Sequence, residues 1–237
     1  MDVTGPVRGV IFDKDGTLFD FRTTWEAWAA AFLRRAAGGD EAQATRAGQA
    51  VGFDLAGSRF ARDSVVIAGT AQEIAEALLP IFPDRTPDAL LDLINTEAAH
   101  APQSEAVPLA PLLTALRGRG LKLGVATNDS EAPARAHLDA AGVTGLFDFV
   151  AGFDSGHGGK PAPGQLLAFC ASMALTPEEV VMVGDSRHDL VAGRAAGMRC
   201  VAVLTGMATA QELAPYATAV LDDIGALPDW LDHHATH

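Results

Sequence analysis

The amino-acid sequence predicts an α/β protein: a doubly wound, Rossmann-like parallel sheet into which an all-α domain is inserted. Short apolar runs typical of buried strands alternate with helical segments. Polar residues directly follow several of these runs, as they do at the ligand-binding edge of open α/β sheets. Residues 21–104 are rich in alanine and helical periodicity. We therefore expect residues 1–20 and 105–237 to form the α/β core and residues 21–104 to form a helical insert.

The first predicted strand ends in two carboxylates. The apolar run Val10–Phe12 is followed by Asp13 and Asp15, and Gly16 then permits a sharp turn. Carboxylates this close at the end of a buried strand repel each other, and a divalent metal ion or a shared proton is the usual resolution. The alternative is an aspartate-rich turn that has no catalytic or metal-binding role.

The insert is predicted to begin with an amphipathic helix. Thr23 and Glu26 have the spacing of a capping box, and Trp25 and Trp28 recur at helical spacing on what we expect to be a core-facing side. Further along the insert, the only ambiguous strand is Val65–Ile67.

After the insert, further apolar runs are predicted to be strands, and polar residues again follow them. Thr127 and Asn128 follow one run, Lys160 lies in a glycine-rich loop beyond another, and Asp185 and Asp189 follow a third. Because the carboxyl ends of parallel strands share one edge, these groups are expected to converge. The runs are Leu121–Ala126, Leu146–Phe153, Val180–Val183, Arg199–Leu204 and Ala219–Leu221.

This set of side chains suits phosphoryl transfer. The transferred group spreads negative charge over its oxygens and needs a cation, a lysine and neutral donors. A carboxylate that attacks phosphorus forms an acyl phosphate, which divides one difficult step into two.

Composition excludes several other classes of function. The formal net charge of −13 makes nucleic acid an unsuitable partner, because phosphate backbones are bound through an excess of Lys and Arg. No apolar run is long enough to cross a membrane, and the first residues lack the pattern of a signal peptide. Cys170 and Cys200 show no metal-site or disulfide spacing and are expected to pack in a reducing compartment. We therefore expect a cytoplasmic protein of undetermined oligomeric state.

The chain resembles the haloacid dehalogenase superfamily of phosphohydrolases, in particular phosphoglycolate phosphatase-like members whose helical cap follows the first motif. The resemblance rests on four motifs in the family's order and covers essentially the whole chain. These motifs are Asp13-Lys14-Asp15-Gly16-Thr17, Thr127-Asn128, Lys160-Pro161-Ala162-Pro163, and Gly184-Asp185-Ser186 with Asp189.

The resemblance implies catalytic roles for five residues. Asp13 would be the nucleophile, and Asp15 would be the general acid and then the base. Neighbouring carboxylates are expected to help Asp15 keep a proton. Thr127 and the backbone of Asn128 would hold phosphoryl oxygens, and Lys160 would neutralise their charge.

The resemblance also implies a Mg²⁺ cofactor, a hard cation that prefers oxygen ligands. Asp13, Asp185 and the backbone carbonyl of Asp15 would bind it. Gly16, Thr17, Ser186 and Asp189 would support these groups, with Asp189 acting on Lys160 or on a metal-bound water.

Lys14 departs from the family pattern, in which an apolar residue usually occupies this position. Strand alternation is expected to point its side chain away from Asp13 and Asp15. Its role stays open at the level of the sequence.

The substrate implied by the resemblance is a small phosphate ester, phosphoglycolate-like or a sugar phosphate. The insert contains arginines but no lysine, so Arg59 and Arg62, which follow Gly57, are candidates to bind the rest of the substrate. The alternative is that both arginines are solvated surface residues.

Two other functions remain open. Gly57-Ser58-Arg59 loosely resembles the hexose-phosphate mutase branch of the superfamily, and the chain could instead be a catalytically idle protein that binds a phosphorylated metabolite.

Overall fold

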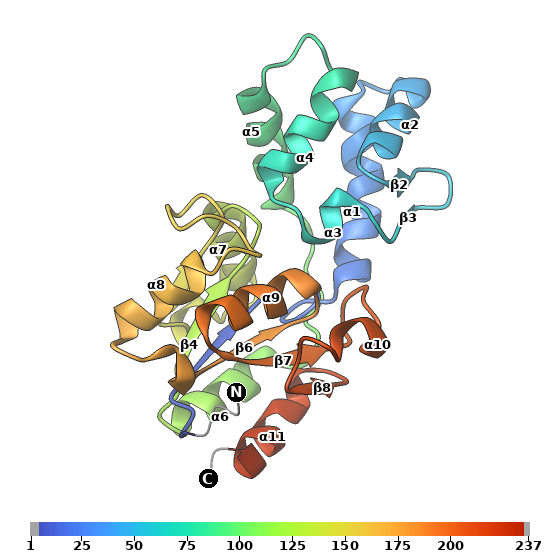
Figure 1. Ribbon diagram of the computed structural model, residues 1–237. Coiled ribbons are helices and arrows are strands. Elements are labelled where there is room, and N and C mark those ends of the chain that lie inside the picture. Colours follow the sequence, from blue (N-terminus) through green and yellow to red (C-terminus); the bar gives the residue numbers. More distant parts are fainter. Residues whose placement is uncertain (1–4, 235–237) are drawn as a thin grey trace.

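The computed structural model describes residues 5–234. At its centre lies a six-stranded parallel sheet in the order β5-β4-β1-β6-β7-β8 (Figure 1). The predicted fold class, a doubly wound parallel sheet, is confirmed. The strands are β1 (Gly9–Phe12), β4 (Lys122–Ala126), β5 (Phe149–Ala151), β6 (Val180–Gly184), β7 (Arg199–Val203) and β8 (Ala219–Leu221).

Helices cover both faces of the sheet because both faces of its strands are apolar. Val10 and Phe12 of β1 pack in the cluster that includes α6, α7 and α11, whereas Ile11 packs in the cluster of α8, α9 and α10. The helices are α6 (Leu109–Gly118), α7 (Glu131–Ala140), α8 (Gly164–Met173), α9 (Arg187–Ala196), α10 (Ala210–Leu213) and α11 (Leu227–His234). Short 3-10 helices lie at Leu79–Ile81, Thr144–Leu146, Pro177–Glu179 and Ile224–Ala226.

The register of the central strands brings the predicted site residues to one edge. Phe12, the last residue of β1, pairs with Val125 of β4 on one side and with Val183 of β6 on the other. The polar residues that follow these three strands therefore emerge side by side at the carboxyl edge of the sheet.

The insert forms a separate layer over this edge, and Figure 1 shows it above the sheet. Its buried residues form their own hydrophobic cluster, to which Phe21, Trp25, Leu78 and Ile94 belong. Its elements are α1 (Phe21–Ala36), α2 (Glu41–Ala50), β2 (Phe53–Asp54), β3 (Arg59–Phe60), α3 (Val65–Ala68), α4 (Ala71–Leu78) and α5 (Pro87–Ala98).

The insert is not wholly helical, contrary to the prediction. Strands β2 and β3 form a small antiparallel hairpin, in which Phe53 pairs with Phe60 and both rings are buried 4.8 Å apart between centroids. Strands of two residues are too short to show alternation, so no sequence pattern indicates them. The ambiguous segment Val65–Ile67 lies in helix α3, which Ser64 caps by accepting a hydrogen bond from the backbone N–H of Val66.

The predicted start of the first helix of the insert is also wrong. The N-cap of α1 is Asp20, whose carboxylate accepts a hydrogen bond from the backbone N–H of Thr23 at 2.7 Å. Thr23 is thus inside the helix. Asp20 is a strong N-cap residue in its own right, and it competes with the Thr23–Glu26 pattern three residues later.

Within residues 5–234, no helix is long and apolar enough to span a membrane. Cys170 and Cys200 are free and buried, as predicted. The expectation that the chain starts without a signal peptide concerns, in part, residues 1–4, which lie outside the described residues.

Candidate active site

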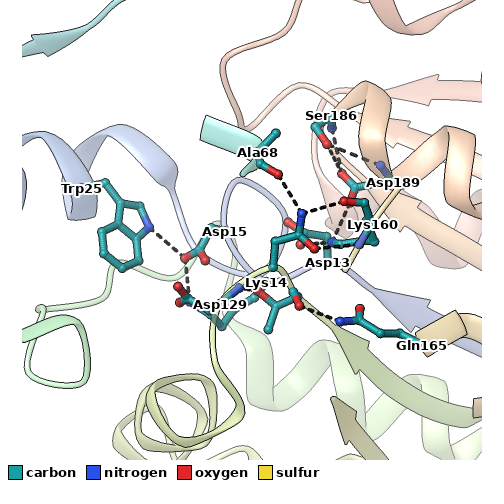
Figure 2. Close-up of polar contacts among 12 residues, drawn as sticks. Asp13, Lys14, Asp15, Trp25, Ala68, Asp129, Lys160, Gln165, Ser186 and Asp189 are labelled. Atoms are coloured by element: carbon teal, nitrogen blue, oxygen red, sulfur yellow. Dashed lines mark hydrogen bonds and ion pairs between the residues drawn. The ribbon is translucent and has the colours of Figure 1, made fainter. Parts of the chain in front are cut away.

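The centre of the site is a buried lysine between two aspartates. Lys160 Nζ lies 2.5 Å from Asp13 Oδ1 and 2.6 Å from Asp189 Oδ1, and all three residues are at most 7 % exposed (Figure 2). Asp13 follows β1, Asp189 lies in the first turn of α9, and Lys160 comes from the loop before α8. The predicted convergence of these three residues therefore occurs.

Asp189 is held in place by the start of its own helix. Its second carboxylate oxygen accepts hydrogen bonds from the backbone N–H and the hydroxyl of Ser186, at 3.0 and 2.7 Å. Ser186 is in turn the N-cap of α9. The capping interaction fixes Asp189, so that its remaining oxygen meets Lys160.

Asp185 completes a cluster of three buried carboxylates. One oxygen from each of Asp13, Asp185 and Asp189 lies within 4.8 Å of the others. Gly16 and Gly206 allow the backbone to lie directly against the Asp185 carboxylate, because a Cβ at either position would collide with it. Gly16 also has φ of +82°, a conformation that favours glycine.

This donor set fits a hard divalent cation. Three carboxylates face one lysine, so the cluster has an excess of negative charge in a buried space, and Mg²⁺ prefers oxygen ligands of this kind. The cluster contains the expected Asp13 and Asp185. Its third member is Asp189, whereas the side chain of Asp15 lies elsewhere, so a role for Asp15 in metal binding rests on its backbone carbonyl alone.

The pKa values of the cluster reflect this crowding. Burial, supported by the charges of Asp189 and Asp15, raises the pKa of Asp13 to about 7 despite Lys160. Burial and then Asp13 and Asp189 raise the pKa of Asp185 well above its usual range. Burial alone would lower the pKa of Lys160, but its contacts with Asp13 and Asp189 raise it. A bound cation would relieve the repulsion among the carboxylates.

Lys14 lies beside Asp15, which contradicts the expectation from strand alternation. Its Nζ is fully buried, 2.7 Å from Asp15 Oδ1 and 3.0 Å from Asp129 Oδ2. Alternation fails here because β1 ends at Phe12, and the chain then turns at Gly16. Lys14 therefore pairs with two carboxylates, whose combined charge its single ammonium offsets only in part. Burial and the charge of Asp15 raise the pKa of Asp129 despite Lys14.

The expectation that neighbouring carboxylates keep a proton on Asp15 is wrong for this structure. Burial would raise the pKa of Asp15, but the charges of Lys14 and His137 and the hydrogen bonds from Lys14 and Trp25 lower it. Trp25 Nε1 donates to Asp15 Oδ1 at 2.9 Å, as Figure 2 shows.

His137 extends this second buried network to the insert. Its Nδ1 lies 3.0 Å from Lys14 Nζ, and its Nε2 lies 2.7 Å from the carbonyl oxygen of Ala98, the last residue of α5. Since Lys14 Nζ can only donate, Nδ1 is the acceptor and Nε2 carries the proton. Burial and the charge of Lys14 lower the pKa of His137 to about 4.

Thr127 and Asn128 lie beside the cluster and shape the loop of Lys160. The Asn128 side chain accepts from the backbone N–H of Lys160 at 2.8 Å and donates to the carbonyl oxygens of Lys160 and Ala68. The Thr127 hydroxyl accepts from the backbone N–H of Asp129, and Gln165 Nε2 donates to the Thr127 carbonyl at 2.9 Å. The predicted role of Thr127 and the Asn128 backbone in holding phosphoryl oxygens stays a prediction.

A cavity between the core and the insert contains these groups. Asp13, Asp15, Thr127, Lys160 and Asp185 line its core side. The insert contributes apolar walls, among them Phe21, Trp25, Trp28, Ile67, Ile74 and Ile94. Trp25 therefore belongs to the buried cluster of the insert, as predicted, and also faces the site.

The structure does not bring Arg59 or Arg62 to this cavity. Arg59 is exposed in the β2–β3 hairpin, next to the turn that contains Gly57 and Ser58. Arg62 is exposed, lies 3.4 Å from Glu212 Oε1 and lines a neighbouring cavity. Their predicted contact with substrate has no support from this geometry, because the hairpin holds Arg59 in solvent and the turn after the hairpin places Arg62 beside Glu212.

Sequence reasoning missed several residues that shape the site. Asp129 comes directly after Thr127 and Asn128 at the end of a predicted strand but is not expected from the sequence to contact Lys14. His137 and Gln165 belong to no motif and reach the site only through folding. Thr205 supports the first loop by donating to the Gly16 carbonyl at 2.6 Å. The position of Trp25 could have been anticipated only in part, since helical spacing marks a core face but not a contact with Asp15.

A haloacid dehalogenase-like hydrolase family model matches residues 7–197. The match includes all four motifs, the sheet edge and the whole insert. The chain belongs to the haloacid dehalogenase-like hydrolase family.

Relatives with assigned names support a phosphatase. The chain is 29% identical over 233 residues to phosphoglycolate phosphatase 1 of Pseudomonas aeruginosa, a match that covers 96% of this chain and 81% of the relative. It is 39% identical over 120 residues to the phosphoglycolate phosphatase of Rhodospirillum rubrum, covering 51% of this chain and 50% of that relative.

The fold is shared more widely. The β-phosphoglucomutase of Clostridium difficile superposes with a TM-score of 0.69 at 17% identity, covering 97% of each chain. The fold alone therefore does not distinguish a phosphatase from a mutase.

Proposed function

We propose that this haloacid dehalogenase-like hydrolase is a Mg²⁺-dependent phosphatase that hydrolyses a small-molecule phosphate monoester through an aspartyl-phosphate. The observation that carries the proposal is the contact of the Asp13 carboxylate with Lys160 beside the carboxylates of Asp185 and Asp189. The nucleophile, a fixed cation and a set of metal-binding oxygens lie within one buried cluster.

In the first half-reaction, a carboxylate oxygen of Asp13 attacks phosphorus while the bond from phosphorus to the ester oxygen breaks. Lys160 offsets the charge on the phosphoryl oxygens, and Thr127 contributes a neutral donor. Asp15 passes a proton to the departing oxygen, so that the alcohol leaves uncharged. Because Lys14 favours the charged form of Asp15, Asp15 first takes up this proton, from solvent or from a monoprotonated phosphate ester.

In the second half-reaction, water attacks the acyl phosphate and releases inorganic phosphate. Asp15 takes a proton from the water and is restored for the next turnover. The ion pair with Lys14 favours its charged form, which is the form that accepts this proton.

A bound Mg²⁺ would be held by Asp13 and Asp185, with Asp189 beside it, and would supply charge stabilisation at the phosphoryl group. The names of the relatives make phosphoglycolate the first candidate substrate. Sugar phosphates are the second candidate class.

The test is Asp13→Asn assayed with Mg²⁺ on p-nitrophenyl phosphate and on a panel of phosphorylated metabolites. The variant should lose turnover and phosphoenzyme together while its circular dichroism spectrum is unchanged. Lys122→Gln, at an exposed lysine remote from the site, is the matched control and should keep full activity. Substantial turnover by the Asp13 variant would exclude the covalent mechanism.

A mutase is the second candidate, because a β-phosphoglucomutase shares the fold. A mutase would convert a hexose 1-phosphate to its 6-phosphate without net release of phosphate, so product analysis separates the two reactions. Absence of both activities in the Mg²⁺-loaded protein would leave the catalytically idle binding protein as the remaining interpretation.

A further inference from the structure

The position of the departing alcohol follows from the two aspartates. In phosphoryl transfer the attacking and leaving oxygens lie roughly in line, so the leaving group points away from Asp13. Asp15 must reach the leaving oxygen, and Asp15 Oδ1 accepts a hydrogen bond from Trp25 Nε1. The leaving group therefore enters the part of the cavity that Trp25 borders.

The walls of that part of the cavity are apolar. Every residue that the insert contributes to the lining is apolar or glycine, and the largest are Phe21, Trp25, Trp28, Ile67, Ile74 and Ile94. Trp25 and Trp28 lie edge to face with ring centroids 5.0 Å apart. Their rings offer surfaces of the kind that pack against flat hydrocarbon groups.

The polar groups on these walls are already engaged. Trp25 Nε1 donates to Asp15, and Trp28 Nε1 donates to the carbonyl oxygen of Glu97 at 3.0 Å. The carbonyl of Ala68 accepts from Asn128. The insert thus has no free side-chain donor at this wall among the residues that the structure describes.

The cations near this part of the cavity are already engaged. Lys14 Nζ lies 5.5 Å from the centroid of the Trp25 ring but is fully buried. Arg62 and Arg187 line the adjoining cavity, where they contact Glu212 and Tyr216. Lys14 is buried between Asp15 and Asp129, and Lys160 is held by Asp13 and Asp189. His188 also lines the cavity, on the core side next to Asp185 and Asp189 rather than on the wall of the insert. A carboxylate on the leaving group would lose water without gaining a partner, which is costly in an apolar site.

We propose that the preferred substrate, given the phosphatase function proposed above, is a phosphate monoester whose leaving group is uncharged and apolar, rather than one that carries a carboxylate. This assignment departs from the phosphoglycolate named for the relatives. It rests on the contact between Asp15 and Trp25 and on the apolar walls beyond it.

The experiment compares two esters of primary alcohols, 2-phenylethyl phosphate and 3-phosphooxypropionate, with phosphoglycolate as a third substrate and methyl phosphate as a small reference. We expect kcat/KM for the phenylethyl ester to exceed that of both carboxylates by roughly tenfold or more. Equal values, or a preference for either carboxylate, would overturn the inference and leave the phosphatase function standing. Loss of all four activities in the presence of Mg²⁺ would instead refute the phosphatase function.

Two variants test whether the insert wall of the cavity determines the preference for an apolar leaving group. Trp28→Ala should lower the ratio of kcat/KM for the phenylethyl ester to that for methyl phosphate roughly tenfold or more. Ile67→Arg places a cation at the half-buried edge of the cavity and should shift the ratio of the two esters toward the carboxylate. Gln72→Arg adds the same charge to the exposed side of α4 and should leave the ratio unchanged. A shift with Gln72→Arg equal to that with Ile67→Arg would contradict the placement.

Discussion

At the scale of single residues, Lys14 differs most from its sequence-based expectation. It is a fully buried cation between Asp15 and Asp129, with His137 as its third neighbour. Burial by itself would lower the pKa of Lys14, but the two carboxylates raise it. The ammonium group is thus a structural counter-charge as well as a neighbour of Asp15, the proposed general acid and base.

Replacing Lys14 by Met should strongly destabilise the protein, because two buried carboxylates would lose their cation. Breaking a buried pair by removing one partner costs about 3–5 kcal/mol. Urea unfolding followed by circular dichroism measures the change. Lys122→Met is the control: its side chain is 49% exposed and lies 3.6 Å from Asp148, so we expect a loss of at most about 1 kcal/mol. Equal effects of the two substitutions would contradict the structural role of Lys14.

His137 should make stability depend on pH. Its pKa is about 4 in the folded protein, against an ordinary value of 6.5 for a solvated histidine, so the unfolded chain binds more protons between these values. Its contribution is complete above pH 6.5 and is lost as pH falls toward 4, by up to about 3 kcal/mol. Urea unfolding at several pH values should show this slope, and His137→Gln should flatten it. An unchanged slope in the variant would assign the dependence to other groups.

At the scale of elements, the N-termini of helices position residues of the candidate site. Ser186 caps α9 and thereby fixes Asp189, while Ser64 caps the short α3 that borders the cavity. The hairpin β2–β3, in contrast, holds Arg59 in solvent and away from the site. The substrate contact predicted for Arg59 has no support for this reason.

Asp20→Ala should destabilise the protein by about 0.5–2 kcal/mol, because it removes the side-chain acceptor at the start of α1. Thr23→Ala should have a much smaller effect, since Thr23 is exposed inside the helix and donates only its backbone N–H to the cap. Thermal unfolding of both variants distinguishes the two caps. A larger loss for Thr23→Ala would restore the capping box predicted from the sequence.

At the scale of the whole molecule, the core and the insert meet through the site itself. Asp15 accepts from Trp25 of α1, His137 contacts the carbonyl of Ala98 in α5, and Asn128 donates to the carbonyl of Ala68. Each of these contacts joins the α/β core to a different part of the insert. The contacts that hold the insert over the cavity therefore also position Asp15 and Asn128.

Mg²⁺ should stabilise the folded protein, because the carboxylate cluster is crowded without a cation. We expect the melting temperature to rise with added Mg²⁺ and to return after chelation. Asp185→Asn should raise the melting temperature of the metal-free protein and abolish the response to Mg²⁺, because it removes one buried charge and one ligand. A full Mg²⁺ response in this variant would remove Asp185 from the metal site.

Local sequence patterns were sufficient to predict the sheet, its strand ends and the main catalytic candidates. Buried parallel strands are continuous apolar runs, and Asp13, Lys160 and Asp185 stand at fixed places beside them. The short strands β2 and β3 left no such pattern, because two residues cannot display alternation.

The completion of the site, in contrast, depends on tertiary packing. The partners of Lys14, the contact from Trp25 to Asp15 and the place of Arg62 all involve chain segments that are distant in sequence. Asp129 and His137 reach Lys14 from more than a hundred residues away. Strand alternation ends with β1 at Phe12. Beyond that residue, the turn at Gly16 and the packing of α7 determine where the side chains of Lys14 and Asp15 point. The apolar wall of the cavity has the same origin, because helical periodicity specifies a buried face but not the group that the face covers.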